Sequence, residues 1–207
     1  MLEVLSTVFG LIQGVLVMLD KRSNWIFYSL QMFFLVLFSI NVHLWGDVAI
    51  DSIYFFVGIG GYFLWRPGNR AAAISVYGWK VRIVWGLAST ALIILSWIVL
   101  SKTNNPLPLL DSITSVTSII ATWFMFNHKL EAWVVWFLND VFYIAEYFML
   151  PDRALYLIGL YIIWTVLAIV SFVNWKRLYR IDRGTAKRHE GELSFWRNIN
   201  RAETLLK

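Results

Sequence analysis

The residues best suited to binding a small molecule lie in one apolar stretch, residues 133–143. Trp133, Trp136, Asp140 and Tyr143 recur every three or four positions, which places them on one face of a helix. Aromatic rings attract flat or cationic ligands, by about 0.5–2 kcal/mol each away from water, and a carboxylate adds charge-assisted hydrogen bonds. The spacing indicates a site for a flat cationic or amine-bearing compound. The alternative is an aromatic packing face with one polar contact between helices.

Polar residues elsewhere in the apolar segments are further candidates. Asp51, Asp140 and Glu146 are the ionisable residues inside these segments, where a charged side chain is costly and indicates function. Asp51 and Glu146 could instead lie at hydrated helix ends, whereas Asp140 lies deeper. Ser115 and Ser118 could equally line a cavity or permit close helix packing. The predicted substrate-binding residues are Asn24, Phe27, Gln31, Asp51, Ser115, Ser118, Trp133, Trp136, Asn139, Asp140 and Tyr143.

The sequence lacks the residue patterns that catalysis or metal binding would need. It contains no cysteine, and His43, His128 and His189 lie far apart without an HExxH-type spacing. No nucleophile–base pair is evident. No lysine or arginine lies inside the apolar segments, so a phosphate would find no partner there. We therefore predict no enzyme activity, no cofactor, no metal site and an unphosphorylated substrate.

The composition indicates a membrane protein. Of the 207 residues, 59% are hydrophobic and 15% are charged, against roughly 25% charged in soluble domains. A soluble chain of this length could not enclose so much apolar surface, whereas lipid allows outward faces to stay apolar. Seven segments are long enough to span a bilayer as helices. They are residues 3–19, 25–42, 47–65, 83–100, 108–126, 132–150 and 154–174.

The basic residues predict the orientation of these spans. Since loops alternate sides, only Lys102 and Arg153 of the 18 basic residues fall on the side of the N-terminus. Cytoplasmic loops carry the excess of lysine and arginine. We therefore expect the N-terminus outside, and the 66–82 loop and the C-terminal tail in the cytoplasm. The tail is expected to be short helix or disorder near anionic lipid, rather than a nucleic-acid-binding segment.

Two segments, residues 3–65 and 111–175, repeat weakly but in register. The first helix of each has a small or polar stripe: Glu3, Thr7, Gly10 and Gly14 in one, and Asp111, Ser115, Ser118 and Thr122 in the other. In the second helices Gln31 aligns with Asp140. Such repeats are typical of transporters whose substrate site lies between the units. The alternative is chance similarity between apolar helices.

The repeat predicts an all-α membrane protein with a 3+1+3 arrangement of seven helices. One linking helix leaves both three-helix units in the same orientation, so the repeats are parallel. The predicted parts are a first unit (1–65), a cytoplasmic loop with the linking helix (66–107), a second unit (108–175) and a basic cytoplasmic tail (176–207).

These residues resemble the PnuC family of bacterial vitamin transporters. The likeness covers residues 2–65 and 108–177. It is carried by residues 2–4 with Gly10, residues 23–25 leading to Trp65, residues 108–112, the pattern Trp133-x-x-Trp136-x-x-x-Asp140, and residues 161–175. The family motif in the sixth helix is two tryptophans followed by an asparagine.

The resemblance implies a full-length relative of the SWEET sugar facilitators, a trimer in the bacterial inner membrane. Members move nicotinamide riboside, thiamine or a flavin down a gradient by alternating access, and a cytoplasmic kinase then traps the vitamin. By position, Trp133 and Trp136 would stack on the ligand. Asp140 would replace the motif asparagine, and Gln31 would be its repeat counterpart.

Departures from the family pattern bear on the substrate. Nicotinamide riboside members have asparagine at the positions of Gln31 and Asp140, glutamine at that of Asp51, and Tyr-Gly-Trp at residues 60–62. Two of these changes add a carboxylate. Thiamine is a permanent cation whose aminopyrimidine suits a carboxylate, so thiamine is the expected substrate. Nicotinamide riboside, also a cation, is the alternative.

One other class of membrane protein also has seven transmembrane helices. A retinal photoreceptor or related receptor needs a lysine in its last helix for the Schiff base, and residues 154–174 contain none. We therefore expect a transporter, and the resemblance to the PnuC family implies uniport rather than proton coupling.

Overall fold

The computed structural model describes residues 1–18, 21–64 and 74–205, which form seven helices and, outside them, one isolated β-bridge. The helices are α1 (Leu2–Met18), α2 (Asn24–Val42), α3 (Trp45–Leu64), α4 (Trp79–Leu100), α5 (Pro108–Phe126), α6 (Glu131–Met149) and α7 (Leu155–Leu205). By length and composition, α2, α4 and the first part of α7, to Ile181, could cross a membrane, and α1 is a shorter apolar helix.

Local sequence signals explain two of the helix ends. Pro108 lies in the first turn of α5, where its missing N–H is not needed. After α2, His43 adopts a left-handed backbone with φ of 61°. This lets the N–H of Leu44 bind the carbonyl of Ser39 at 2.9 Å. The turn between α2 and α3 is therefore only two residues long, and the two helices pack closely.

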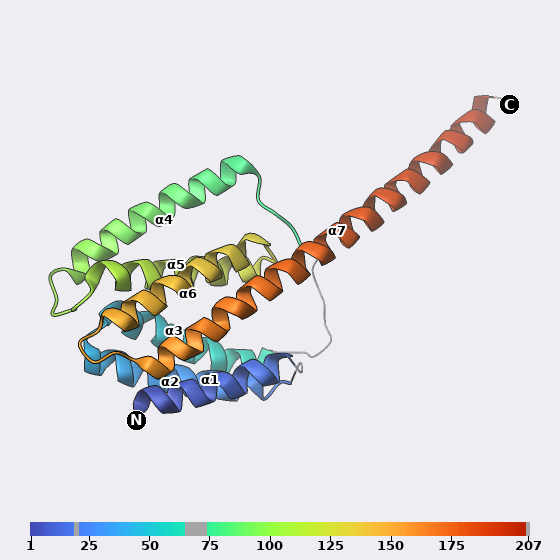
Figure 1. Ribbon diagram of the computed structural model, residues 1–207. Helices are drawn as coiled ribbons and strands as arrows, with labels where there is room; N and C mark the ends of the chain where they lie inside the picture. The colour runs from blue at the N-terminus through green and yellow to red at the C-terminus, as the bar shows by residue number, and fades with distance from the viewer. Residues whose placement is uncertain (19–20, 65–73, 206–207) are drawn as a thin grey trace.

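The helices form two groups of three that meet along two seams (Figure 1). Within the groups, α2 packs against α1 and α3, and α6 packs against α5 and α7. Between the groups, α1 contacts α7 and α3 contacts α5. The first helix of each group thus touches the third helix of the other, as expected of two units related by a two-fold axis along the bundle.

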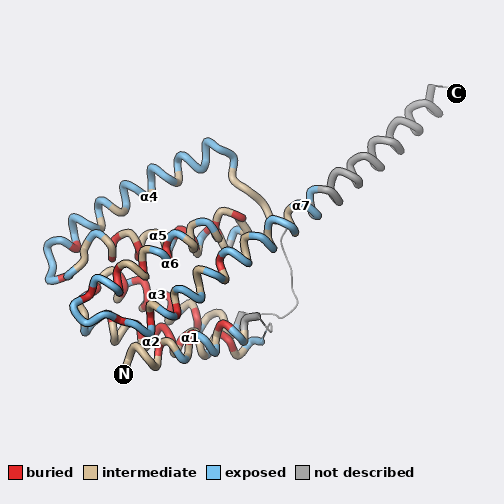
Figure 2. Tube along the Cα trace, in the orientation of Figure 1, coloured by how far each residue is buried: buried red, intermediate tan, exposed pale blue. Residues whose placement is uncertain are grey.

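The linking helix α4 lies on the outside of the bundle. It packs mainly against α5, and Figure 2 shows it exposed along nearly its whole length. Its exposed side chains include Ile83, Leu87, Leu95 and Trp97. A helix that is apolar on all sides and uncovered by protein is suited to contact with lipid.

The last helix differs most from the sequence prediction. We expected short helix or disorder over residues 176–207, but α7 continues as one helix to Leu205 and projects from the bundle (Figure 1). Residues 176–205 contain no proline, so nothing in the backbone ends the helix. α4 also begins earlier than predicted, at Trp79. Of the predicted 66–82 loop, residues 66–73 lie outside the described residues.

The connections gather at two ends of the bundle, as alternating spans require. At one end, the indole N–H of Trp45 donates to Asn104 Oδ1 at 2.7 Å, joining the α2–α3 turn to the loop before α5. At the other end, Arg22 donates to the carbonyl of Tyr62. The N-terminus-outside orientation inferred from the basic residues stays a prediction.

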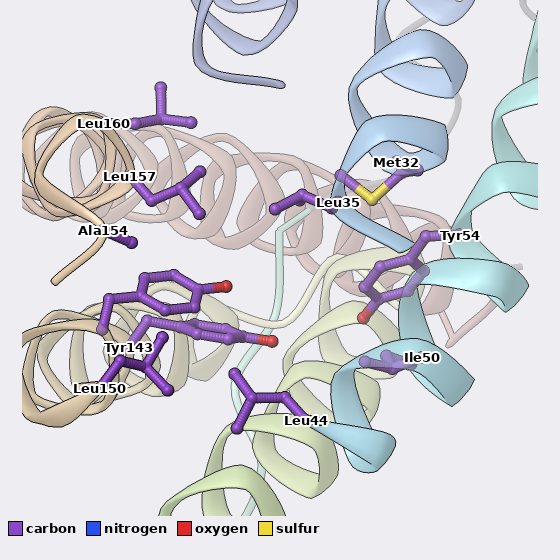
Figure 3. Close-up of a cluster of buried hydrophobic side chains, with 11 residues drawn as sticks. Met32, Leu35, Leu44, Ile50, Tyr54, Tyr143, Leu150, Ala154, Leu157 and Leu160 are labelled. Carbon is purple, nitrogen blue, oxygen red and sulfur yellow. The ribbon is translucent and has the colours of Figure 1, made fainter. Parts of the chain in front are cut away.

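The larger hydrophobic core lies between the two units (Figure 3). It draws side chains from α2, α3, α6 and α7, from the turn between α2 and α3, and from the loop before α7. Its buried members are Met32, Leu35, Leu44, Ile50, Tyr54, Tyr143, Tyr147, Leu150, Ala154, Leu157 and Leu160. A smaller core of Ile120, Phe124 and Ala132 joins α5 to α6.

Candidate functional site

The two tryptophans predicted to bind a ligand, Trp133 and Trp136, have different neighbours in the structure. The Trp133 ring lies edge-on to Trp175 of α7, with ring centroids 5.4 Å apart. Trp136 packs beside the smaller core between α5 and α6. Within the described part of the chain, the indole N–H groups of both residues are buried without an acceptor. A buried unpaired donor is unfavourable, so both groups need an explanation that the described residues do not give.

Two buried carboxylates face the centre of the bundle. Asp140 of α6 is 4% exposed and Asp51 of α3 is 5% exposed, and no hydrogen bond or ion pair from a described residue reaches either carboxylate. Both lie within electrostatic range of Tyr161 of α7. An unpaired buried charge is unfavourable unless a positive group lies beside it.

Tyrosines surround these carboxylates. Tyr28, Tyr54, Tyr143, Tyr147 and Tyr161 all belong to the larger core or pack against it. The Tyr143 ring stacks on Tyr161 with centroids 4.5 Å apart. Figure 3 shows Tyr54 and Tyr143, which come from opposite units, with their hydroxyl ends directed toward the space between them. The centre thus combines aromatic faces, hydroxyls and carboxylates, which suits a cationic ligand bearing hydroxyl groups.

Asn139 joins α6 to α5. Its side-chain amide donates to the Thr114 carbonyl and Thr117 Oγ1, both at 2.8 Å, and to Ser118 Oγ at 3.1 Å. The Asn139 Oδ1 atom is buried without a donor among the described residues. The amide therefore positions α6, and its oxygen stays available to a ligand.

The contacts of Gln31 match those of Asn139 in the second unit, not those of Asp140, which the sequence repeat had aligned with it. The Gln31 amide packs on Gly10, where a Cβ would lie 2.8 Å from its Nε2 atom, and Ser6 donates to the Gln31 carbonyl. Asn139 makes the corresponding contacts in the second unit, on Ser118. The sequence matched Gln31 with Asp140, one residue further on. A one-residue slip turns a helical side chain by about 100°, so Asp140 points elsewhere.

Four other predicted residues contact neighbouring residues of the bundle. Asn24 donates to the Lys21 carbonyl at 2.7 Å near the start of α2. Phe27 packs against Phe9 of α1. Ser115 donates to Asp111 at 3.2 Å, and Ser118 accepts from Asn139. Of the two readings of the serine stripe, these contacts favour close helix packing.

Sequence reasoning missed most of the tyrosines. It named Tyr143 as a site residue, and the four-residue spacing to Tyr147 could have added that ring. Tyr28 and Tyr54 lie on separate helices of the first unit and share no spacing with α6. Their approach depends on how the two units pack, which no local pattern reports.

The fold and its polar centre define an α-helical membrane transporter. The structure superposes with a TM-score of 0.69 on a protein described as the vitamin B3 transporter PnuC, covering 86% of this chain and 82% of that one at 22% identity. The pattern of the nicotinamide mononucleotide transporter family matches residues 1–177, so the chain belongs to that family of transporters.

A curated relative agrees. The nicotinamide riboside transporter PnuC of Neisseria mucosa is 24% identical over 203 residues, covering 90% of this chain and 73% of the relative. The resemblance to the PnuC family, the all-helical seven-helix fold and the absence of an enzyme class are thereby confirmed.

Proposed function

We propose that the protein carries nicotinamide riboside across the bacterial inner membrane by facilitated diffusion. The observation that carries the proposal is the pair of buried carboxylates, Asp51 and Asp140, which have no donor among the described residues and lie near Tyr161. The name of the curated relative gives the same compound.

The chemistry of nicotinamide riboside fits these groups. Its pyridinium ring is flat and positively charged, so it can stack on tryptophan and tyrosine and pair with a carboxylate. Its carboxamide can donate to Asn139 Oδ1 or accept from the indole of Trp136. Its ribose hydroxyls can bind tyrosine hydroxyls and the second carboxylate.

The charge distribution argues against a phosphorylated substrate. Residues 23–65, 130–152 and 154–175 contain neither lysine nor arginine. A phosphate carried into the centre would meet Asp51 and Asp140 and no basic group, which is repulsive. The nucleoside is therefore the better substrate than the mononucleotide for which the family is described.

The preference for thiamine that the added carboxylates suggested is not supported. The curated relative is described as a nicotinamide riboside transporter, and the solved structure as a vitamin B3 transporter. Since both compounds are cations, the carboxylates suit either. The comparisons therefore favour the alternative substrate, nicotinamide riboside.

Transport would proceed by alternating access. The two three-helix units would rock about the tyrosine-lined centre, opening it first to one side and then to the other. Phosphorylation in the cytoplasm would trap the nucleoside. The predicted trimer and the N-terminus-outside orientation accompany this proposal as family expectations.

Uptake of labelled nicotinamide riboside in a bacterial strain lacking its own carrier tests the proposal, with unlabelled thiamine as competitor. We expect saturable uptake that excess thiamine does not inhibit, and a loss of at least tenfold in Asp140→Ala. The exposed Asp152→Ala is the matched control and should transport normally. Uptake of thiamine without nicotinamide riboside would overturn the substrate, and uptake of neither would overturn the vitamin class.

A further inference from the structure

Three acidic side chains meet at the end of the bundle that carries the α2–α3 turn. Asp47 lies in the first turn of α3, Asp111 in the first turn of α5 and Glu146 in the last turn of α6. All three are 0% exposed, and one carboxylate oxygen from each lies within 4.8 Å of the others. The group joins the first unit to the second, and none of its members belongs to the central site proposed above.

Asp111 is fixed as a carboxylate by four donors. It accepts from the backbone N–H groups of Gly46 and Asp47, both at 2.8 Å, and from the side chains of Asn105 and Ser115. The two backbone donors belong to the start of α3, where the helix dipole also favours negative charge. The negative charge of Asp111 is thus accounted for by its surroundings.

Glu146 is different, because one of its oxygens has no partner. Its Oε2 accepts from Thr114 Oγ1 at 3.0 Å, while its Oε1 is buried without a donor among the described residues. Asp47 beside it accepts from Tyr143 at 3.1 Å and from Tyr147 at 3.4 Å. A buried carboxylate oxygen without a partner, next to two further carboxylates, is strongly unfavourable unless a positive group fills the gap.

The described part of the chain supplies no such positive group. Its ion pair, between Arg82 and Glu131, lies at the opposite end of the bundle. Arg153 lies over the ring of Phe148, and Lys102 is exposed in its loop. No side chain of the described residues therefore supplies the compensating charge, which leaves a bound cation or shared protons.

We propose that Asp47, Asp111 and Glu146 bind a hard metal cation, sodium or calcium. The three carboxylates and the tyrosine and threonine hydroxyls that contact them supply oxygen atoms, and hard cations prefer oxygen ligands. Calcium lies about 2.3–2.6 Å from its oxygens, so two ligands on opposite sides lie up to about 5 Å apart. The three oxygens lie within 4.8 Å of one another, close enough for one ion to contact all of them.

The bound cation would hold the two units together at this end. It would tie α3 of the first unit to α5 and α6 of the second. Since Asp47 also accepts from Tyr143, whose ring stacks on Tyr161, the ion would order the tyrosines on one side of the transport centre. The inference is independent of which vitamin is carried.

Thermal unfolding of the purified protein in detergent tests this inference. The protein is first equilibrated in choline chloride, and NaCl or CaCl2 is then added at constant ionic strength. We expect a saturable rise of the unfolding midpoint, of about 5–10 °C at one hundred times the Kd, with one of the two salts. A rise with millimolar CaCl2 identifies calcium, and a rise with NaCl alone identifies sodium.

Glu146→Gln should abolish the rise, whereas Glu131→Gln, at the opposite end, should keep it. Equilibrium dialysis of the wild-type protein with ⁴⁵Ca²⁺ or ²²Na⁺ adds a readout that needs no variant, and we expect one bound ion per chain. No bound ion, an equal rise in Glu146→Gln, or stabilisation by acid alone would overturn the proposal. The last result would show that the carboxylates share protons instead.

Discussion

Glu3 and Asp111 each accept hydrogen bonds from the start of a helix in the other three-helix unit. Asp111, on the first helix of the second unit, accepts from the backbone N–H groups of Gly46 and Asp47 at the start of α3. Glu3, on the first helix of the first unit, accepts from those of Tyr156 and Leu157 at the start of α7. Each unit thus caps the third helix of the other.

A second pair of contacts follows the same symmetry. Trp164 of α7 packs on Gly14 of α1, where a Cβ would lie 3.3 Å from the indole ring. Tyr54 of α3 meets Thr122 of α5, with their hydroxyl oxygens 2.6 Å apart. Gly14 and Thr122 are the last residues of the two stripes that the sequence aligned. We infer that the weak sequence repeat reflects two structurally equivalent units.

Removing the caps that Asp111 forms on α3 and Glu3 forms on α7 should cause unequal losses of stability. Asp111→Asn replaces the acceptor of four donors by an amide, and we expect about 1–3 kcal/mol of destabilisation. Glu3→Gln affects two donors at a more exposed site, and about 0.5–2 kcal/mol is expected. Thermal unfolding in detergent measures both, with Asp152→Asn as an exposed control. An equal or larger loss for Glu3→Gln would contradict the proposed ranking.

Gly46→Ala should destabilise the protein by about 1–3 kcal/mol through overpacking. A Cβ at this position would lie 2.6 Å from Ser115 Oγ and also against Asp111, so α3 would be forced from α5. At Gly60, by contrast, a Cβ would have no described atom within 4 Å. Gly60→Ala on the same helix is therefore the matched control, and its unfolding midpoint should not fall.

Tyr161→Phe should weaken binding of nicotinamide riboside about 3- to 10-fold, the loss expected for one hydrogen bond of about 0.5–1.5 kcal/mol. The ring that stacks on Tyr143 is retained, so the fold should be unchanged. Quenching of tryptophan fluorescence measures the Kd. Tyr156→Phe, at an exposed position of the same helix, serves as control. Unchanged affinity in Tyr161→Phe would place the hydroxyl outside the site.

Glu131→Gln should have only a small effect on stability. Glu131 pairs with Arg82 at 2.8 Å and accepts from the Tyr77 N–H at 2.9 Å, but the Arg82 side chain is 54% exposed. Solvent screens such a pair, so we expect less than about 1 kcal/mol. Unfolding at low and high salt should show the difference from wild type shrinking as salt rises. A difference that grows with salt would contradict this account.

Much of the fold could be predicted from the sequence because a bilayer imposes a minimum length on each apolar segment. The seven predicted spans agree with the helices to within a few residues, apart from α4, which begins four residues early, and α7, which continues far beyond its span. Hydropathy falls after Trp175, where Lys176 and Arg177 begin the polar tail, but helix formation does not depend on hydropathy. The polarity of the tail therefore led to the wrong expectation for its structure.

The residues of the central site could be predicted from the sequence only where one helix supplied several of them. The face with Trp136 and Asp140 followed from spacing on α6. Asp47 is the first residue of a predicted span, and its approach to Glu146 depends on the packing of helices about 100 residues apart. Matching Gln31 with Asp140 was wrong by one residue, because polar residues on apolar helices align easily after a slip.

The caps formed by Glu3 and Asp111 are also contacts through which two copies of a three-helix chain could assemble. Two identical three-helix proteins lying parallel in a membrane would each place the acid of the first helix on the third helix of the other. That is the self-complementary contact of a two-fold homodimer. We infer that Glu3 and Asp111 derive from one acidic residue, which made this contact twice in an ancestral homodimer. Fusion through α4 would then have freed the two copies to diverge, so that Asp51 in one now faces Tyr161 in the other.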